Sequence, residues 1–545
     1  MPLGRLLAVA RTGSLAVSFL LLLGAASAGD NAQARGLGRP AVEVTAAARH
    51  DASAPLWLLQ RPDFTLEREE EEENDHRVHR FRKLPPAALR ATGAPDAVLQ
   101  SEMPWIRMPA VGVTFDGVGQ GFTGPGGTFS VASAPPDTSG DVGPNHYIQV
   151  VNSGFAIFNK SGTTLFGPAP TNTLWSGFGG LCQTTNAGDA IVLYDALADR
   201  WFMTQFAFNT SGGGPVAPFF QCVAVSQTGD PTGAWYRYAY QYADFPDYGK
   251  FGVWPDGYYA TFNMFAAGTL AWAGGNNCVY DRAAMLSGAP ATQQCINLGT
   301  NYGGLLPADL DGTRLPPAGS PGYIMGFDVT PNSHLQLWHF RVSWANPAAT
   351  TLTMQPTIPV ATINLACGNG GTCVPQAGTA NRLDTLGDRL MFRLAYRNFG
   401  THDALVSNLT VNTAASSTAN TGVRWFELRN PGTAPTLFQE GTYAPDANYR
   451  WMGSIAQDGQ GNMGLGFSLS SSSLSPSIRY TGRLVTDPLG QMAQGENTII
   501  NGASQTGTLT RWGDYSMMGV DPTDDCTFWY TTEYLAAAGS FNWRT

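Results

Sequence analysis

The chain has 545 residues, of which 13% are charged, and a formal net charge of −10 at neutral pH. It contains 64 Gly, 36 Pro, 14 Trp, 19 Tyr and 28 Phe residues, a composition typical of a strand-rich extracellular protein. Lysine occurs only at Lys83, Lys160 and Lys250, and no stretch is rich in both Lys and Arg. The sequence therefore excludes a nucleic-acid-binding surface, because phosphate binding needs clustered positive charge.

The N-terminus has the pattern of an export signal. Arg5 and Arg11 precede an apolar run over 15–23 that ends in Ala26-Ser27-Ala28, a small-residue cleavage pattern. The run is shorter than the roughly 20 residues that a membrane-spanning helix needs. We therefore predict a signal peptide at 1–28 and a secreted protein, extracellular or periplasmic, with no membrane attachment after cleavage.

The next segment differs in composition from the rest. Over 67–83 a block of acidic residues is followed by a block of basic residues, and like-charge blocks do not pack into a core. We predict that 29–104 is a disordered charged leader or pro-segment. The folded domain is expected over 105–545, where a strand near 105–115 could complete its last sheet.

A short phrase recurs along 105–545: an apolar strand, a tight turn with Asp or Asn, and a second apolar strand. Its copies lie at 146–160, 191–207, 251–264, 323–344, 388–411, 452–470 and 515–534. A single hairpin cannot bury its apolar faces, whereas sheets stacked radially can. The pattern predicts an all-β fold, a single β-propeller of about seven four-stranded antiparallel blades. Six blades is the alternative, because the first two hairpins are close enough in sequence to share a blade.

Seven cysteines in an exported chain favour disulfides over metal thiolates. Cys367 and Cys373 flank a glycine-rich loop, and Cys278 and Cys295 bracket a small insertion. Cys182 and Cys222 could join neighbouring strands of one blade. Cys526 is left over beside Phe528 and Tyr530, and we expect it to be a buried free thiol.

One whole blade is readable from residue 190, with four apolar strands separated by turn residues. Its third turn, TGDPTGAW at 228–235, resembles with one extra residue the Asp-box turn of sialidase-like propellers, where the turn is structural. The phrases FGVWPDGYYATFNM, LLPADLDGTRLPPAGSPGYIM and WGDYSMMGVDPTDDCTFWYTTEY resemble segments of a family of exported bacterial β-propeller proteins. The resemblance covers most of 105–545 and implies a fold and an exported location, but no mechanism.

Acidic and basic residues stand just before the innermost strand of successive repeats. In propellers the loops that enter these strands meet at one mouth of the central channel, where ligands bind. We therefore expect these residues to converge: Asp137, Asp141, Asp189, Asp247, Lys250, Asp309, Asp311, Arg382, Asp384, Arg450, Arg511, Trp512 and Asp514.

Such a set could cleave a glycosidic bond, because that reaction needs one carboxyl as acid and another as nucleophile or base. The catalytic candidates are Asp247, Asp384 and Asp514. The ligand-binding candidates would pair with an anionic sugar or stack on it: Asp141, Asp189, Arg382, Arg450, Arg511, Trp512 and Tyr515. The plan is similar to that of sialidases, but Glu is scarce beyond residue 100 and the Tyr-Glu nucleophile pair of sialidases has no clear match.

Three interpretations of these residues stay open. The Asp and Arg side chains could pair with each other and close the ring, they could bind a ligand or a channel Ca²⁺ without turnover, or they could degrade a glycan. The predicted function is binding of an extracellular glycan, peptide or ion at the mouth by a monomer. The alternative is a sialidase-like hydrolase or lyase. No cofactor is expected beyond a structural Ca²⁺.

Overall fold

The computed structural model describes residues 41–61, 69–70, 93–327, 332–368, 371–416 and 418–545, and the structural statements below concern these residues. The predicted signal peptide at 1–28 lies outside them. Regular structure is almost entirely β-strand, and the two α-helices, α2 (Leu181–Thr184) and α3 (Arg282–Ser287), are short. The all-β class is confirmed. None of the described helices is long and apolar enough to cross a membrane.

Three antiparallel sheets follow one another from residue 139. The first contains β8 (Ser139–Val142), β9 (His146–Val151), β10 (Gly154–Asn159) and β11 (Thr164–Pro170). The second contains β12 (Ile191–Asp195), β13 (Arg200–Ser211), β14 (Gly214–Ser226) and β15 (Trp235–Tyr242). The third contains β16 (Phe245–Trp254), β17 (Gly257–Phe265), β18 (Trp272–Tyr280) and β19 (Thr292–Asn297).

The next two groups of strands are joined into one sheet. The first group is β20 (Leu306–Leu310), β21 (Gly322–Phe327), β22 (His334–Arg341) and β23 (Thr351–Met354), with β24 (Ile358–Pro359) beside β22. The second is β27 (Met391–Asn398), β28 (Asp403–Asn412), β29 (Thr421–Arg429) and β30 (Thr436–Tyr443). They are joined because β20 pairs in parallel with β27 through Ala308 and Leu394.

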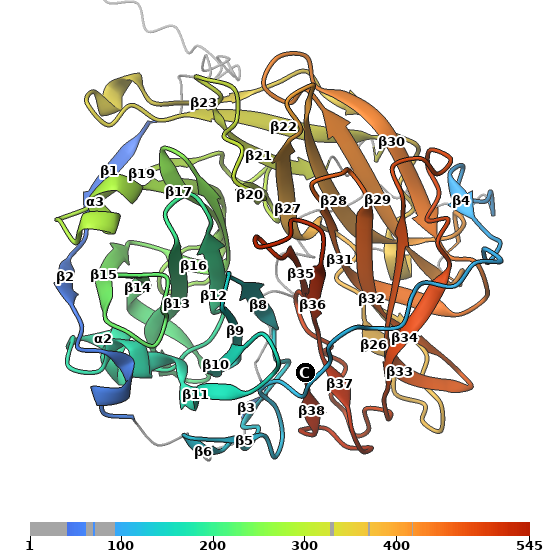
Figure 1. Ribbon diagram of the computed structural model, residues 1–545, viewed down its shortest axis with the longest axis horizontal. Helices are drawn as coiled ribbons and strands as arrows, with labels where there is room; N and C mark the ends of the chain where they lie inside the picture. Colours follow the sequence, from blue (N-terminus) through green and yellow to red (C-terminus); the bar gives the residue numbers. More distant parts are fainter. Residues whose placement is uncertain (1–40, 62–68, 71–92, 328–331, 369–370, 417) are drawn as a thin grey trace, which may run out of the picture. The chain divides into compact units, whose positions relative to one another are not determined.

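Two further sheets complete the ring. One contains β31 (Tyr449–Gln457), β32 (Met463–Ser471), β33 (Leu474–Arg483) and β34 (Glu496–Asn501). The other has only β35 (Met517–Val520) and β36 (Phe528–Thr531). The first strands contact one another in a closed cycle, in the order β8, β12, β16, β20, β27, β31, β35 and back to β8. The sheets therefore form a propeller-like ring (Figure 1).

Short elements occupy the remaining segments. They are η1 (Leu56–Leu58), η2 (Thr171–Trp175), η3 (Pro347–Ala349), η4 (Ala366–Gly368), β3 (Glu69–Glu70), β5 (Thr123–Gly124), β6 (Gly127–Thr128), β7 (Ser133–Ala134), β25 (Thr372–Val374), β26 (Leu383–Asp384), β37 (Tyr534–Leu535) and β38 (Trp543–Arg544). No strand forms over 105–115, so the strand expected there is absent. Residues 105–115 instead run beside the β35–β36 sheet without regular strand pairing.

Part of the predicted disordered leader is ordered, so that prediction is wrong for its described residues. Strand β1 (Glu43–Ala46) pairs with β19, β2 (Arg49–Ala52) pairs with β15, and β4 (Leu99–Gln100) pairs with β30. Each adds a strand to the outer edge of a sheet, which satisfies backbone groups that an open edge would expose. Residues 62–68 and 71–92 of the leader lie outside the described residues.

The recurring Asp of the hairpin turns closes the turns. Asp195 Oδ1 accepts hydrogen bonds from Leu197 N and Ala198 N at 3.1 and 3.2 Å. Asp458 Oδ1 accepts from the amides of residues 460 and 462, and Asp521 Oδ1 from Thr523 N. Because a carboxylate two residues before an amide mimics a backbone turn, these residues fix the hairpins on which the repeat depends.

The three predicted disulfides are confirmed. Cys182–Cys222, Cys278–Cys295 and Cys367–Cys373 are bonded. Cys278–Cys295 joins the neighbouring strands β18 and β19. Cys182 lies in helix α2, so Cys182–Cys222 joins this helix to β14 and not two strands of one blade, as was expected. Cys526 is free as expected, but it is exposed rather than buried, because it lies in the β35–β36 turn instead of the strand.

The turn at 228–235 is held by its own side chains. Asp230 Oδ1 accepts from Thr232 N and Thr232 Oγ1, and Trp235 Nε1 donates to Pro231 O at 2.9 Å. Trp235 is buried between this turn and the sheet. The turn therefore acts as a structural brace between β14 and β15.

Candidate functional site

Each of the seven strands of the inner cycle has a residue in the left-handed backbone region either in its first four residues or in the segment just before it, and we call this part of the strand its entry. Five of these residues are not glycine, which is uncommon because the side chain is then crowded against the backbone. The residues are Asp137 (φ 47°), Asp189 (φ 46°), Tyr248 (φ 53°), Gly304 (φ 60°), Leu386 (φ 43°), Met452 (φ 54°) and Gly513 (φ 44°). The same backbone conformation thus recurs near the start of every inner strand.

Hydrogen bonds join three of these entries. Asp137 Oδ1 accepts from Asp514 N at 2.7 Å, and Asp137 Oδ2 accepts from Asn152 Nδ2 at 2.9 Å. Asn152 Oδ1 in turn accepts from Asp189 N at 3.0 Å. All four residues are buried. The predicted site residues Asp189 and Asp514 therefore belong to one connected cluster although they are far apart in sequence.

Cations and aromatic rings from three other segments meet beside this cluster. The Lys250 Nζ atom lies 3.5 Å from the centre of the Tyr248 ring and 4.0 Å from that of Tyr515. The Arg389 guanidinium lies 4.6 Å from the Tyr248 ring centre. Contacts of this kind hold a cation where water is excluded. The ring of the predicted ligand-binding residue Tyr515 thus contacts the ammonium group of Lys250. Asp247 lies three residues before Lys250 on β16.

Arg511, Asp514 and Glu533 form an acid–base group at the last entry. Arg511 Nη2 donates to Asp514 Oδ1 at hydrogen-bond distance. Glu533 is 3% exposed, and its Oε1 atom has no hydrogen-bond partner among the described residues. Burial raises the pKa of the Glu533 carboxyl well above its usual value, with Asp514 adding to the shift and Arg511 opposing it.

The sequence analysis did not single out Glu533. Its signal was weak but present, because it is one of only five Glu residues beyond residue 100 and follows directly after an apolar strand. Its neighbours Arg511 and Asp514 are about twenty residues earlier, so only the packing of the last hairpin brings them together.

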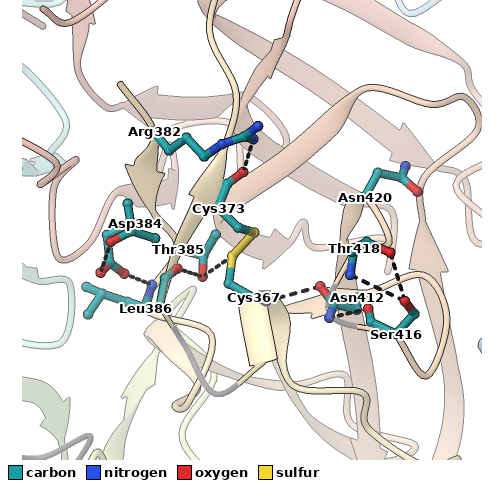
Figure 2. Close-up of a disulfide and its surroundings, with 12 residues drawn as sticks. Cys367, Cys373, Arg382, Asp384, Thr385, Leu386, Asn412, Ser416, Thr418 and Asn420 are labelled. Carbon is teal, nitrogen blue, oxygen red and sulfur yellow. Dashed lines mark hydrogen bonds between the residues drawn. A yellow bond between two sulfur atoms is a disulfide. The ribbon is translucent and has the colours of Figure 1, made fainter. Parts of the chain in front are cut away.

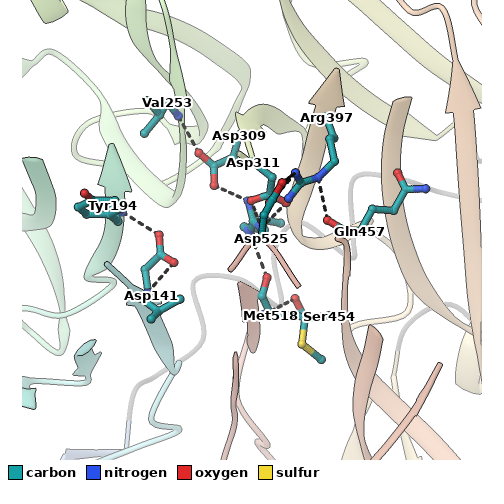
Figure 3. A network of polar contacts seen from close by, with 12 residues as sticks. Asp141, Tyr194, Val253, Asp309, Asp311, Arg397, Ser454, Gln457, Met518 and Asp525 are labelled. Carbon is teal, nitrogen blue, oxygen red and sulfur yellow. Dashed lines mark hydrogen bonds and ion pairs between the residues drawn. The ribbon is translucent and has the colours of Figure 1, made fainter. Parts of the chain in front are cut away.

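Asp141, Asp309 and Asp311 belong to a second polar network (Figure 3). Arg393 Nη1 donates to Asp309 Oδ2 at 2.7 Å, Nη2 to Asp311 Oδ1 at 2.6 Å, and Nε to Met518 O at 3.1 Å. Asp141 Oδ2 accepts from Tyr194 N at 2.7 Å. The network joins five inner strands, β8, β12, β20, β27 and β35, and has more acids than bases.

Burial raises the pKa values of two carboxyls in this network. Burial raises the pKa of the Asp141 carboxyl to about 7, and nearby Asp309 adds to the shift while Arg393 opposes it. Burial likewise raises the pKa of Asp309 to about 6. The folded channel therefore favours the protonated form of Asp141 at pH values where the unfolded chain is ionised.

We expect a pH dependence of stability from Asp141. Because the pKa of the Asp141 carboxyl is higher in the folded than in the unfolded state, the folded state binds this proton more tightly. The resulting contribution to the free energy of unfolding is fully present below the unfolded-state pKa and is lost as the pH rises through the folded-state pKa of about 7. Between pH 5 and pH 8 the wild type should lose on the order of 2 kcal/mol relative to Asp141→Asn, whose side chain does not ionise. Urea unfolding of both proteins at each pH measures this difference. A parallel pH dependence in the two proteins would contradict the assignment.

Arg382 and Asp384 lie beside the Cys367–Cys373 disulfide (Figure 2), and the backbone amide of Asp384 donates to Thr510 O at 2.9 Å, next to Arg511. Arg382 is exposed, and its Nη1 donates to Cys373 O at 2.9 Å. Asp384 is buried and accepts from Leu386 N at 2.9 Å and from Thr372 Oγ1 at 3.4 Å. Asp384 thus stabilises the left-handed turn at Leu386, and its contacts are those of a structural residue.

Arg450 and Trp512 are also structural in their contacts. Arg450 is fully buried, with its guanidinium paired to Asp446 at 2.8 Å and to Glu496 at 2.9 Å. Trp512 is buried, packs against Trp451 and donates from Nε1 to Ser468 Oγ at 3.1 Å. Both side chains are therefore buried in contacts with other residues of the protein.

Among the residues described in the structure, no group of three or more His, Cys, Asp or Glu side chains is placed to hold a metal ion. The carboxylates of the channel are instead spaced by Arg393 and by backbone amides.

No protein-family model matches the chain, and no curated protein matches it. The solved structures that it resembles include an exo-β-1,3-galactanase of Phanerochaete chrysosporium with galactose, at 10% identity and a TM-score of 0.30, covering 67% of this chain and 80% of that one. The same enzyme with β-1,3-galactotriose gives 10% identity and a TM-score of 0.29, covering 67% and 79%.

A third solved structure is a glycoside hydrolase family 43 β-1,3-galactosidase with galactodeoxynojirimycin. It is 9% identical, with a TM-score of 0.27, and the match covers 59% of this chain and 97% of that one. At these TM-scores the matches carry no argument about activity. The function must be argued from the residues of this chain.

Proposed function

We propose that the protein is a secreted, monomeric β-propeller that binds an extracellular ligand at the channel mouth without turning it over. The observation that carries the proposal is the meeting of charged and aromatic side chains at the entries of the inner strands: Asp137, Asp189, Tyr248, Lys250, Arg389, Arg511, Asp514 and Tyr515. Export is supported by the three disulfides, which persist in oxidising compartments.

Seven blades are the count we propose. The support is the seven inner strands that share a left-handed entry and contact one another in a cycle. The last blade departs from the four-stranded plan because it has only β35 and β36. A distant relation to sialidase-like propellers rests on the turn at 228–235 alone.

The chemistry of the mouth favours a polar ligand with both a ring face and a charged or hydroxyl-rich group. Lys250, Arg389 and Arg511 contribute positive charge, Asp189 contributes a carboxylate, and Tyr248 and Tyr515 contribute apolar ring faces. A glycan combines these features in one molecule. Binding without turnover is favoured because Asp514 is paired with Arg511 and Asp384 serves a backbone turn.

The test is a glycan-binding array of neutral and acidic oligosaccharides, probed with the full chain. Arg511→Gln should lower binding at least tenfold, because it removes a charged donor of the mouth cluster, whereas Arg382→Gln should leave binding unchanged. Arg382 is the matched control, since it was predicted for the same role but lies exposed beside a disulfide. Thermal midpoints of both variants separate lost binding from lost folding. Equal effects of the two substitutions, or no binding to any glycan, would overturn the proposal.

A glycan-degrading activity is the second candidate, and Glu533 favours it. A buried carboxyl with a raised pKa is suited to act as a general acid, and Asp514, which is paired with Arg511, could serve as its partner. In this scheme Glu533 protonates the leaving oxygen and Asp514 acts as base or nucleophile. Asp247 and Asp384 have no part in it.

Release of sugar from a polysaccharide panel distinguishes the two candidates. Under the second, Glu533→Gln should abolish product release while binding is retained, because Gln keeps the shape and loses the proton. Activity should fall as the pH rises through the raised pKa of Glu533. Binding without product in both proteins supports the first candidate.

A further inference from the structure

The two-stranded sheet β35–β36 leaves space where the other sheets have their outer strands. A cavity of about 720 Å³ lies there, which is within the usual range for a small-molecule site. Its walls are β36, the outer part of the β31–β34 sheet and β9, and residues 108–117 run along it. It is separate from the mouth cluster described above, because none of that cluster's charged residues lines it.

The walls of the cavity are aromatic on two sides. On one side Trp529 stacks on Tyr147 with ring centres 5.2 Å apart. On the other, Phe528 and Tyr530 pack against the backbone of β32, where Gly464 and Gly466 leave room for the rings. A Cβ atom at Gly466 would lie 2.5 Å from the Tyr530 ring, so glycine is required at this close approach.

The polar side chains of the walls already have partners. Gln149 accepts from Val118 N and donates to Thr531 Oγ1, and Tyr530 Oη donates to Ser516 Oγ. Tyr534 Oη donates to Asp116, the only charged side chain in the lining, which also lies near Arg544. The cavity therefore offers an occupant mainly apolar and aromatic surface, with Asp116 as the charged side chain of its lining.

The segment leading to the cavity is apolar and open to water. Met103, Trp105, Ile106 and Val113 are 43%, 103%, 59% and 56% exposed. Exposed large apolar side chains in sequence mark binding surfaces, because water disfavours them. Of these four residues Val113 lines the cavity, whereas Met103, Trp105 and Ile106 line a separate pocket beside Arg479 and Glu496.

From this geometry we propose that the cavity beside β36 is a binding site for an uncharged, mainly apolar small molecule with a flat ring or an acyl chain. The ligand stacks between the Trp529 side and the Tyr530 side of the cavity. It displaces water from the side chains of Ile478 and Ile500. The proposal goes beyond the mouth site and does not depend on it.

The test uses N-phenyl-1-naphthylamine, a neutral apolar probe whose fluorescence rises on leaving water, with the full chain. Ile500 lies opposite Ile478 on neighbouring strands and lines the cavity. Ile500→Trp should fill the cavity and weaken probe binding at least tenfold, whereas Ile500→Ala should enlarge it and retain binding. Energy transfer from tryptophan to the probe should fall in Trp529→Phe, which places the probe in this cavity.

Leu489→Trp adds the same ring at an exposed position outside the cavity and serves as the matched control. Its affinity for the probe should equal that of the wild type, and thermal midpoints show that each variant is folded. Failure of the wild type to bind the probe, or equal binding by the wild type and folded Ile500→Trp, would overturn the proposal. Neither outcome bears on glycan binding at the mouth, so the two proposals fail separately.

Discussion

Replacement of Arg393 by alanine should lower the free energy of unfolding by about 3–5 kcal/mol, the largest effect expected of a single change in the channel. Arg393 is 2% exposed and holds Asp309, Asp311 and the carbonyl of Met518. Its guanidinium thus ties β20, β27 and β35 together across the ring. Without it two buried carboxyls lose their partner, and the fold must protonate them or admit water.

The loss should be greater at pH 8 than at pH 5. Arg393 opposes the raised pKa of Asp141 and Asp309, so its removal raises both further and makes their ionisation at high pH more costly. Guanidinium unfolding at the two pH values measures the difference. Arg393→Ala combined with Asp309→Asn and Asp311→Asn is the control, and it should recover part of the stability. A triple variant as unstable as Arg393→Ala would show that packing, not charge, is the cause.

Deletion of residues 1–53 should destabilise the folded domain by about 3 kcal/mol relative to deletion of residues 1–40. The longer deletion removes β1 and β2 from the edges of β19 and β15. It also removes Asp51, whose carboxylate accepts two hydrogen bonds from the buried Arg237 at 2.8 and 2.7 Å, and Ser53, which binds Trp235 N. Arg237 would then be left without its counter-ion.

Thermal unfolding of the two truncated proteins measures this difference, and Asp51→Asn in the full chain isolates the ion pair. The substitution should account for only part of the loss, since the strand pairing remains. Equal midpoints for the two deletions would mean that these strands lie on the domain without stabilising it.

The repeat found in the sequence mixes two kinds of hairpin. The turns near 197, 256, 401, 459 and 523 join the first and second strands of a sheet, whereas those near 153 and 332 join the second and third. The short spacing between the first two copies follows from this difference, and the two hairpins belong to separate sheets. Both kinds have the same alternation and turn residues, so the sequence does not distinguish them.

The leader strands and Glu533 show why other features were not predicted. β1 and β2 have four residues each and pair only because β15 and β19 present open edges. Glu533 has a raised pKa only because β36 carries it into a buried position beside Asp514. In both cases the property depends on a neighbour distant in sequence.

The sequence by itself determined the all-β class, the three disulfide pairings, and the hairpin turns, because alternation, Cys spacing and Asp-closed turns are local properties. It also placed charged residues at the entries of the inner strands. Only the tertiary structure decided which of them meet. It linked Asp189 to Asp514 through Asn152 and Asp137, paired Arg511 with Asp514, and placed Tyr515 beside Lys250. It put Asp141 close to Arg393 and gave Arg382, Asp384, Arg450 and Trp512 partners elsewhere in the protein. The physical reason is that closure of the ring sets the distances between blades, and no local pattern encodes those distances.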